Sequence, residues 1–316
     1  MSRRRNRIGR IVCLAASTCA ALLLIPAFDR PSEVAAPPDS TGHYDMARTH
    51  MASAEGLCTS TEGMAEQVLS ILDGWAARIR AETERHFYRF RRNPAEYQNS
   101  EGYFRVLLMA VVLHEDFGVR YNPAKIGTPG EASASDGFFA DPRDVFIHGL
   151  LGPSRMGTCS SMPVLYVALG RRLGYPLKLV TTKGHLFVRW EAQSERFNIE
   201  VTGRGVNRYD DEHYRHWPFE LTDEEIAANG YLKSLTPDEE HAVFLSIRAE
   251  CLREAKRYYE AVTALSEAVQ LAPNIRFYRL LLADIQAKAA EHADQTASRS
   301  HQRMAVCDPV VPSTIR

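Results

Sequence analysis

The spacing of apolar residues predicts two helices in the first half of the chain. Between Met64 and Arg92, apolar residues recur at steps of three and four, the period of one helix face. Asn93-Pro94 ends this helix, because a proline disfavours helical geometry in the residue before it. A second apolar stripe predicts a helix from Tyr103 to Glu115. Residues Phe117 to Asp141 are rich in Gly, Pro, Ala and Ser, which predicts a loop with room for one short strand.

Between Asp144 and Thr202 the pattern predicts one helix followed by three short strands. The helix runs from about Cys159 to Leu173 and ends at Gly174, where a left-handed cap costs least. The strands are expected at Leu177–Val180, His185–Trp190 and Phe197–Val201. Because side chains alternate across a strand, His185 faces away from Leu186, Val188 and Trp190, and Asn198 and Glu200 face away from Phe197, Ile199 and Val201.

Beyond Asp238 the pattern is wholly helical. Leu245, Ala249 and Leu252 mark a first helix, and a second carries apolar residues at the spacing of a tetratricopeptide repeat: Tyr258, Ala261, Leu265, Ala268 and Pro273. A further helix near Phe277–Ala290 would cap this pair. One repeat buries too little surface to be stable alone, so we expect it to dock on the preceding domain.

The chain therefore divides into five expected parts. They are a signal peptide or N-terminal membrane anchor (1–28), a flexible linker (29–60), an α+β domain (61–235), tetratricopeptide-like helices (236–290) and a disordered tail (291–316). The linker is rich in Pro, Ser, Ala, Asp and Gly without an apolar period, and the tail is polar.

Charge changes this picture only at the amino terminus. The 316-residue chain has a formal net charge of −1, so it lacks the positive field of a nucleic-acid-binding protein. Five arginines between Arg3 and Arg10 precede an uncharged, mostly apolar stretch from Ile11 to Phe28. This order is typical of a secretory signal or an anchor, and both interpretations stay open. We expect an exported protein that contacts the membrane only through this segment.

The cysteines do not predict a metal site. Six are present, at positions 13, 19, 58, 159, 251 and 307, and none stands in metal-binding spacing. The sequence also lacks HExxH, GxxxxGK[ST], GxGxxG and GxSxG motifs. We therefore expect neither a metal nor a cofactor. Export would permit a disulfide, for instance between Cys58 and Cys307, whereas a disulfide through Cys159 would exclude the chemistry considered next.

Cys159 and His185 are the candidate chemical pair. Acyl transfer through a thiol needs a thiolate, which a helix amino terminus stabilises through its free amides, and Cys159 follows Gly157-Thr158 at such a terminus. It also needs a base within hydrogen-bonding reach and a polar group that orients the base. Pairing of the strands predicts that His185 lies opposite Asn198 or Glu200, and either side chain could hold the imidazole.

These residues carry a resemblance to a known family. Gly157-Thr158-Cys159, Tyr166, the run Arg171–Pro176 and the run Gly184–Arg189 resemble the core of the transglutaminase-like superfamily, and Asp141–Ile147 resembles its preceding segment. The similarity is greatest to a bacterial branch with C-terminal tetratricopeptide-like helices. It implies a papain-type fold in which Cys159 is the nucleophile and His185 the base, for amide hydrolysis or acyl transfer on a peptide or protein.

The third member of the site departs from the family pattern. The family has Asp-Pro where this chain has Glu200-Val201, so Glu200 takes the position of the acid, and Asn198 is the alternative, as in papain-like enzymes. Two functions stay open. The first is a thiol-dependent hydrolase or acyl transferase, and the second is a non-catalytic peptide-binding or scaffold protein whose helical repeat binds a protein partner.

Overall fold

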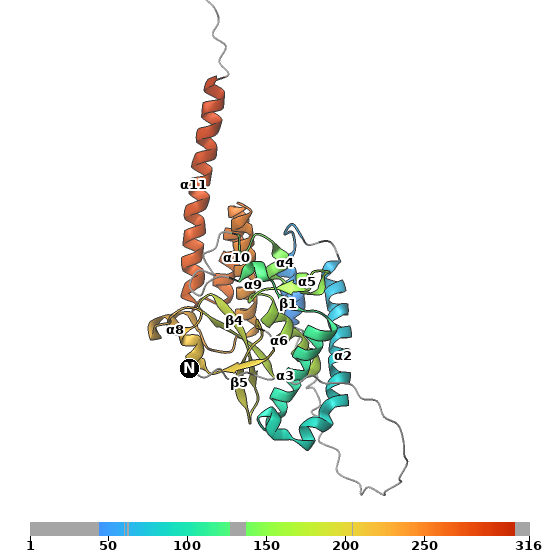
Figure 1. The fold of residues 1–316 in the computed structure, drawn as a ribbon. Coiled ribbons are helices and arrows are strands. Elements are labelled where there is room, and N and C mark those ends of the chain that lie inside the picture. Colours follow the sequence, from blue (N-terminus) through green and yellow to red (C-terminus); the bar gives the residue numbers. More distant parts are fainter. Residues whose placement is uncertain (1–43, 60, 62, 127–136, 204, 307–316) are drawn as a thin grey trace, which may run out of the picture. The chain divides into compact units, whose positions relative to one another are not determined.

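The computed structural model describes residues 44–59, 61, 63–126, 137–203 and 205–306, with side chains through residue 296 (Figure 1). The expected signal or anchor at 1–28 lies outside these residues, as do residues 307–316 of the expected tail. No helix in the described ranges is both long enough and apolar enough to cross a membrane.

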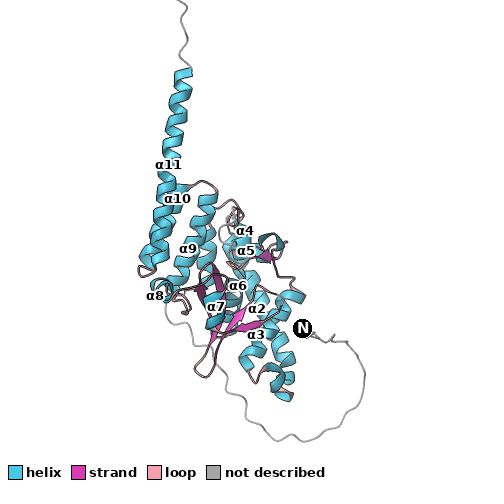
Figure 2. Cartoon of the chain, turned by 60° about the vertical axis from the view of Figure 1, so that its left-hand side comes forward, coloured by secondary structure: helices cyan, strands magenta, loops and turns pink. Residues whose placement is uncertain are grey.

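The architecture is α+β, with many helices around a small sheet (Figure 2). The α-helices are α1 (Met46–Ala54), α2 (Met64–Arg92), α3 (Glu101–Val111), α4 (Pro142–Val145), α5 (Ile147–Leu151), α6 (Met162–Leu173), α7 (Asp211–His216), α8 (Asp223–Asn229), α9 (Pro237–Glu254), α10 (Tyr258–Leu271) and α11 (Arg276–Val306). Short turns of other helix types are η1 (Pro94–Tyr97), η2 (Val112–Asp116) and η3 (Pro123–Lys125). The strands are β1 (Arg120–Tyr121), β2 (Met156–Gly157), β3 (Leu177–Thr182), β4 (His185–Glu191), β5 (Arg196–Glu200) and β6 (Asn207–Tyr209).

The main sheet is antiparallel, in the order β3-β4-β5-β6. β3 and β4 form a hairpin with the two-residue turn Lys183-Gly184. The free edge of β3 is covered by residues 232–235, because the Leu232 amide donates to Thr181 O and the Leu235 amide to Leu179 O, each at 2.9 Å. This segment leads directly into α9 and so places the C-terminal helices beside the sheet.

Both faces of the sheet are covered. One face, with Leu186, Val188 and Ile199, belongs to the main apolar core, which it shares with the buried side of α6. The other face carries Phe187, which stacks on Tyr214 of α7 with ring centroids 3.7 Å apart. The predicted alternation of side chains along β4 and β5 is therefore confirmed. His185 and Glu200 lie on the α7 side, and neither is exposed to bulk solvent.

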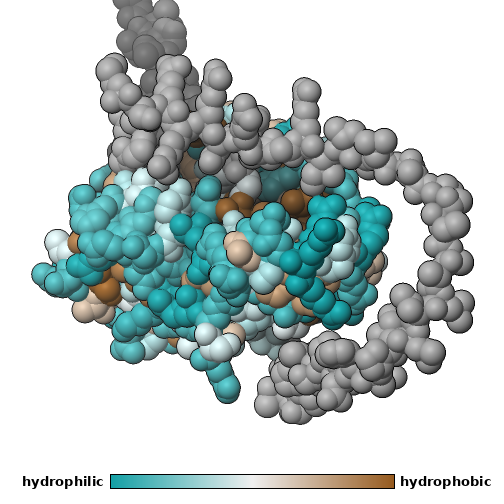
Figure 3. All heavy atoms as spheres, turned by 60° about the horizontal axis from the view of Figure 1, so that its bottom comes forward, coloured by the Kyte–Doolittle hydropathy of each residue, from teal (hydrophilic) through white to brown (hydrophobic). Residues whose placement is uncertain are grey.

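Most of the buried apolar residues gather in one main core. The surface drawn in Figure 3 is mainly hydrophilic, and hydrophobic residues reach it only in small, separate patches. The same core cluster includes buried residues of α2, α6, α9 and α10. The expected boundary at 235/236 therefore does not separate two cores, and α9 and α10 pack on the preceding domain, as predicted for the C-terminal helices.

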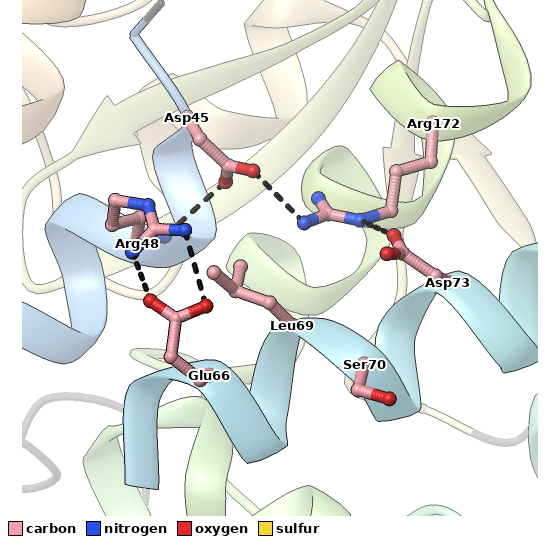
Figure 4. A pocket seen from close by; sticks show the side chains of 7 residues that line it. All are labelled: Asp45, Arg48, Glu66, Leu69, Ser70, Asp73 and Arg172. Atoms are coloured by element: carbon pink, nitrogen blue, oxygen red, sulfur yellow. Dashed lines mark hydrogen bonds and ion pairs between the residues drawn. The ribbon is translucent and has the colours of Figure 1, made fainter. Parts of the chain in front are cut away.

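The predicted linker is wrong between residues 46 and 54, where α1 forms. Asp45 caps this helix by accepting from the Ala47 amide at 2.8 Å, and His50 and Met51 are buried. Figure 4 shows how the start of α1 is fixed: Arg172 of α6 donates to Asp45 and to Asp73 of α2, at 2.9 Å each. The helix escaped prediction because its inward face includes His50, which a hydropathy pattern counts as polar.

The predicted C-terminal helix pair is present as α9 and α10. α9 and α10 pack on each other, and Leu245, Ala261, Leu265 and Ala268 are buried at their contact, with Tyr258 half-buried. Glu240 at the start of α9 is fully buried and forms a bidentate ion pair with Arg171 of α6, with one N–O distance of 3.0 Å. This charge pair holds the repeat against the helix that follows Cys159.

The prediction of a disordered tail is wrong between residues 291 and 306, because α11 continues to Val306. Several residues of this stretch are Ala, Gln or Arg, which favour helix. Further short elements, among them α4, α5, β2, β6, α7 and α8, were not predicted. Each is short, and each lacks the apolar period on which such a prediction depends.

Candidate functional site

Cys159 lies in the tight turn that precedes α6. The sequence predicted a helix from about Cys159, but α6 begins at Met162, three residues later. Pro163 sets this boundary, because a proline fits the first turn of a helix, where its missing N–H would have no partner. The end of the helix is as predicted, with Gly174 in the left-handed conformation at φ 75°.

The turn is held by a short network of hydroxyl groups. Thr158 and Ser161 both donate to the backbone carbonyl of Asp144 in α4, at 2.9 and 2.8 Å. Ser161 also accepts from the Thr158 amide at 3.0 Å. A Cβ at Gly157 would come within 2.8 Å of the Leu150 side chain, so only glycine fits before the turn. Cys159 is therefore carried on backbone that is fixed from both sides, and its side chain is partly exposed.

His185 is bound to Glu200, as one of the two sequence alternatives predicted. The His185 Nε2 and Glu200 Oε2 atoms are 2.8 Å apart, and both side chains are buried. The predicted pairing of β4 with β5, which placed His185 directly opposite Asn198 or Glu200, was wrong: even from the Glu200 alternative it differs by two residues. Val188 lies opposite Ile199 and Arg189 opposite Asn198, which makes Glu200 a diagonal neighbour of His185. A diagonal neighbour on the same face is farther away, and the longer glutamate side chain spans that distance.

Three donors besides His185 fix the Glu200 carboxylate. Its Oε1 atom accepts from the Thr202 amide at 2.9 Å and from the Thr202 hydroxyl, and its Oε2 atom accepts from the Tyr214 hydroxyl at 3.3 Å. Burial alone would raise the pKa of Glu200. The His185 charge and the hydrogen bonds from His185 and Thr202 outweigh burial, and the pKa lies below its ordinary value. Glu200 is therefore a carboxylate at neutral pH, with its orientation set.

The environment of His185 favours the imidazolium. Burial under Trp217, whose ring centroid is 4.6 Å away, lowers the pKa of His185. The carboxylate of Glu200 and the neighbouring Cys159 act in the opposite direction more strongly, and they raise the pKa from 6.5 to about 10. A buried imidazolium between a carboxylate and a thiol follows from these contacts.

Cys159 completes the arrangement on the other side of the ring. Its side chain lies close enough to the imidazole of His185 to raise the pKa of the ring. Because Nε2 of the ring is engaged by Glu200, Nδ1 is the atom available to the sulfur. Cys159 and His185 line the same cavity of about 650 Å³, which continues toward α9 and α11. A molecule in this cavity has access to both side chains.

Tyr121 is a residue of the site that sequence reasoning missed. β1 pairs in parallel with β2, which places Tyr121 beside Gly157, two residues before the nucleophile candidate. Its hydroxyl donates to Lys125 O at 3.4 Å, lies close to Cys159 and lines the same cavity. Burial first, and then the charge of Cys159, raise the pKa of Tyr121, so its hydroxyl keeps its proton. Nothing in the sequence near Tyr121 signals this role, because a two-residue strand has no period.

Asn198, the alternative partner for His185, lies in a different network. Its Oδ1 atom accepts from Arg189 Nε and its Nδ2 atom donates to Asp211 Oδ1, both at 2.8 Å. The Arg189 guanidinium, which is 2% exposed, also donates to Asp211 Oδ1 at 2.8 Å and to Leu232 O at 3.0 Å. Asn198 is thus engaged four residues along the face from His185, and Glu200 alone holds the imidazole.

No second chemical centre stands out in the described part of the chain. The hollow drawn in Figure 4 is lined by ion-paired side chains, such as Arg48 with Glu66 and Arg172 with Asp73, which leaves its charges already matched. Within the described ranges no group of three or more His, Cys, Asp or Glu side chains is placed to hold a metal ion.

Among the described residues, Cys58, Cys159 and Cys251 are free thiols. Cys307, the other half of the disulfide considered from the sequence, lies outside them. Comparison of the chain with family models, with curated proteins and with solved structures gave no match.

Proposed function

We propose that the protein is a thiol-dependent amide hydrolase or acyl transferase of the transglutaminase-like, papain type. The observation that carries this proposal is that Cys159 and His185 line one cavity, while the imidazole is bound to the buried Glu200 carboxylate through Nε2. A nucleophile, a proton carrier and a group that orients the carrier are the three parts that such catalysis needs.

The contacts support a defined sequence of steps. The Cys159 thiolate attacks the amide carbonyl carbon of the substrate, and the carbonyl electrons move to the oxygen. As the intermediate collapses, the C–N bond breaks and His185 Nδ1–H gives its proton to the departing amine, which leaves a thioester on Cys159. Water or a second amine then attacks the thioester and passes its proton to His185, which releases the acyl product and returns the thiolate.

The developing oxyanion needs donors on the Cys159 side of the cavity. The backbone amide of Cys159 and the protonated hydroxyl of Tyr121 are next to each other there. In the resting protein the hydroxyl donates to Lys125 O at 3.4 Å. A substrate carbonyl oxygen that takes this hydroxyl from Lys125 O, and that also accepts from the Cys159 amide, would receive both donors, and such fixed donors supply a large part of acyl-transfer catalysis.

Glu200 fits the role of the orienting acid in spite of its length. It reaches His185 from the diagonal position, and the two Thr202 contacts keep its second oxygen occupied. A carboxylate at this position holds one tautomer of the neutral ring and stabilises the imidazolium. The departure from the aspartate of the family is therefore matched by the geometry of the strands. In this proposal the reaction takes place after export, as the arginine-rich start of the chain suggests.

The experiment is alkylation of Cys159 by iodoacetamide, with the labelled positions identified by mass spectrometry. We expect Cys159 to be labelled at pH 6 at least about tenfold faster than Cys58, which is more exposed and serves as an internal control. The His185→Ala variant removes the imidazolium, and Cys159 should then react no faster than Cys58. Equal rates for Cys159 in the parent and in this variant would contradict the proposal.

The second candidate function is a peptide-binding protein without turnover. It is favoured by one observation, that the cavity continues from Cys159 onto α9 and α11. Under this reading the Cys159→Ala variant would retain all measurable activity. Peptide binding and amide turnover measured on that variant separate the two functions.

A further inference from the structure

The cavity beside Cys159 extends well beyond the reacting groups. Its far wall is one stripe of α9, made of Glu239, Val243, Ser246, Ile247 and Glu250. These positions recur at steps of three and four, so they lie on a single helix face. The middle of the stripe carries the apolar side chains of Val243 and Ile247, and a glutamate lies at each end.

The opposite wall is formed by α11 and is mostly apolar. Phe277 and Leu280 line the cavity, although they are 42% and 58% exposed. Phe138 and Phe139 add aromatic surface to the lining. Large apolar side chains that are left in water around a cavity favour the binding of an apolar group there.

The charges around the cavity are unbalanced toward the negative. Four carboxylates line it, and two of them are neutralised by cations that also line it: Glu225 by Lys183 at 2.7 Å and Glu224 by Arg276 at 3.0 Å. Glu239 caps α9 and Glu250 contacts Arg253, which lies outside the lining. Within the cavity itself the excess charge is therefore negative.

Glu250 is the carboxylate best placed to receive a cation. Its side chain is only 15% exposed, and Arg253 binds it from one side at 2.6 Å. Burial raises the pKa of Glu250 above its ordinary value in spite of Arg253. A second cation from the cavity side would therefore restore the interactions that the carboxylate lost with water.

We propose that the cavity binds an extended segment of the substrate in which a bulky apolar residue and a lysine or arginine lie two positions apart. This inference rests on the proposed function, because it names the substrate class of the same site. The apolar side chain packs between Val243, Ile247 and Leu280, and the cationic side chain meets Glu250.

The spacing follows from helix and strand geometry. A rise of about 1.5 Å per residue places Ile247 about 4.5 Å and Val243 about 10.5 Å from Glu250 along the axis of α9. Residues two apart on an extended chain lie about 6.6 Å from each other and point to the same side. The spacing of about 6.6 Å lies between the distances of about 4.5 and 10.5 Å. An apolar residue of the segment can therefore contact both Ile247 and Val243 while the cationic residue two positions away reaches Glu250.

The test is binding of fluorescein-labelled peptides to the full-length Cys159→Ala variant, measured by fluorescence polarisation. The probe has the sequence Gly-Leu-Ala-Lys-Gly, and two matched probes carry norleucine or glutamate in place of the lysine. We expect the lysine probe to bind about tenfold tighter than the norleucine probe, as for one charge-assisted hydrogen bond. Adding Glu250→Gln should remove this preference, and Glu250→Lys should reverse it toward the glutamate probe.

Matched controls distinguish binding in the cavity from nonspecific electrostatic attraction and from nonspecific binding to exposed apolar side chains. Glu267 on α10 and Tyr259 are exposed and lie outside the cavity. Glu267→Gln should leave the lysine preference unchanged. Leu280→Ser should weaken all three probes, whereas Tyr259→Ser should weaken none. Equal binding of the lysine and norleucine probes, or an equal effect of Glu250→Gln and Glu267→Gln, would overturn the inference.

This failure can be told apart from failure of the proposed function. If Cys159 in the parent protein is rapidly alkylated but the probes bind without preference, only the substrate class is wrong. If the probes bind as expected but Cys159 is no more reactive than Cys58, the pocket stands as described and the enzyme proposal is wrong.

Discussion

Two polar networks occupy the same face of the main sheet, and their difference separates a structural group from a chemical one. At one end Arg189, Asn198 and Asp211 satisfy one another, and the guanidinium has a further bond to Leu232 O. At the other end His185 is bound to Glu200 through one nitrogen only, while its other side faces Cys159 and a cavity.

Comparison of the two networks indicates that burial and charge do not by themselves identify a reactive site. Arg189 is more deeply buried than His185, yet the bonds it makes leave little capacity for a ligand. His185 keeps one ring nitrogen for exchange of a proton, and the turn before α6 places a nucleophile there. The unused hydrogen-bonding capacity, and its position at a cavity, distinguish the second network.

The largest effect expected from this comparison is the loss of turnover at the cavity end. Cys159→Ala and His185→Ala should each reduce amide cleavage or amine incorporation in a peptide library by at least about 10³-fold, because each removes an indispensable participant. Because His185→Ala leaves the buried Glu200 carboxylate without its cation, circular dichroism of each variant checks that it is folded. Turnover within tenfold of the parent in either variant would contradict the assignment.

At the other end we expect a large loss of stability and no change in chemistry. Arg189→Met removes the cation from a buried network and leaves Asp211 with Asn198 and Arg196 alone. Asp211 is 35% exposed and keeps Arg196, so the main loss is at Asn198 Oδ1 and Leu232 O, and each buried oxygen left without its donor costs about 1–3 kcal/mol. Urea unfolding measures this loss, and the alkylation rate of Cys159 in the folded variant should equal that of the parent. If Cys159 is alkylated more slowly in the fully folded Arg189→Met variant than in the parent, the two networks are coupled.

Glu200→Gln should have a smaller effect that depends on pH. The folded-state pKa of His185 is about 10, against 6.5 as its ordinary value, so the folded protein binds this proton more tightly than the unfolded chain. That stabilisation is complete below pH 6.5 and is lost as the pH rises toward 10. The variant lacks the carboxylate that raises this pKa, so burial should lower it instead.

The measurement is urea unfolding of the parent and the Glu200→Gln variant at pH 6.5 and pH 10. We expect the parent to be more stable by about 2 kcal/mol at the lower pH, the size of one hydrogen bond to a charged group. The difference in free energy of unfolding between the parent and the Glu200→Gln variant should be smaller at pH 10. Turnover should be reduced but retained, because the amide still contacts the ring. A stability gap that widens with pH would show that Glu200 does not favour the imidazolium.

The smallest effect is expected for Asn198→Ala, which tests the alternative partner. The change removes an acceptor from Arg189 and a donor to Asp211, and leaving these buried groups unpaired costs about 1–2 kcal/mol. Turnover and the pH profile of Cys159 alkylation should stay as in the parent. A loss of turnover as large as that of Glu200→Gln would reinstate Asn198 as the partner of His185.

The sequence was informative where a period was long or a residue was chemically distinctive. The helix Met64–Arg92 has the predicted ends, and the alternation along β4 correctly separated His185 from Leu186 and Val188. The choice between Glu200 and Asn198 could not be made from the pattern. It depends on the pairing of β4 with β5, and a shift of two residues keeps every side chain on the same face.

The features that escaped prediction all depend on contacts between distant parts of the chain. Tyr121 reaches Cys159 through two-residue strands, and the cavity wall on α9 is placed by residues 232–235 beside β3. α1 is fixed by Arg172, more than a hundred residues away in the sequence. Local patterns carry no signal for such arrangements, since the stabilising partners are not neighbours in the chain.

The most direct test of the central claim is the titration of His185 by NMR, with its ring nitrogens labelled and assigned by comparison with His185→Ala. The account predicts an imidazolium that persists through pH 8, because Glu200 and Cys159 outweigh burial and hold the pKa near 10. A ring that is already neutral at pH 6 would contradict it, because burial would then dominate and the network around Cys159 would lack its proton donor.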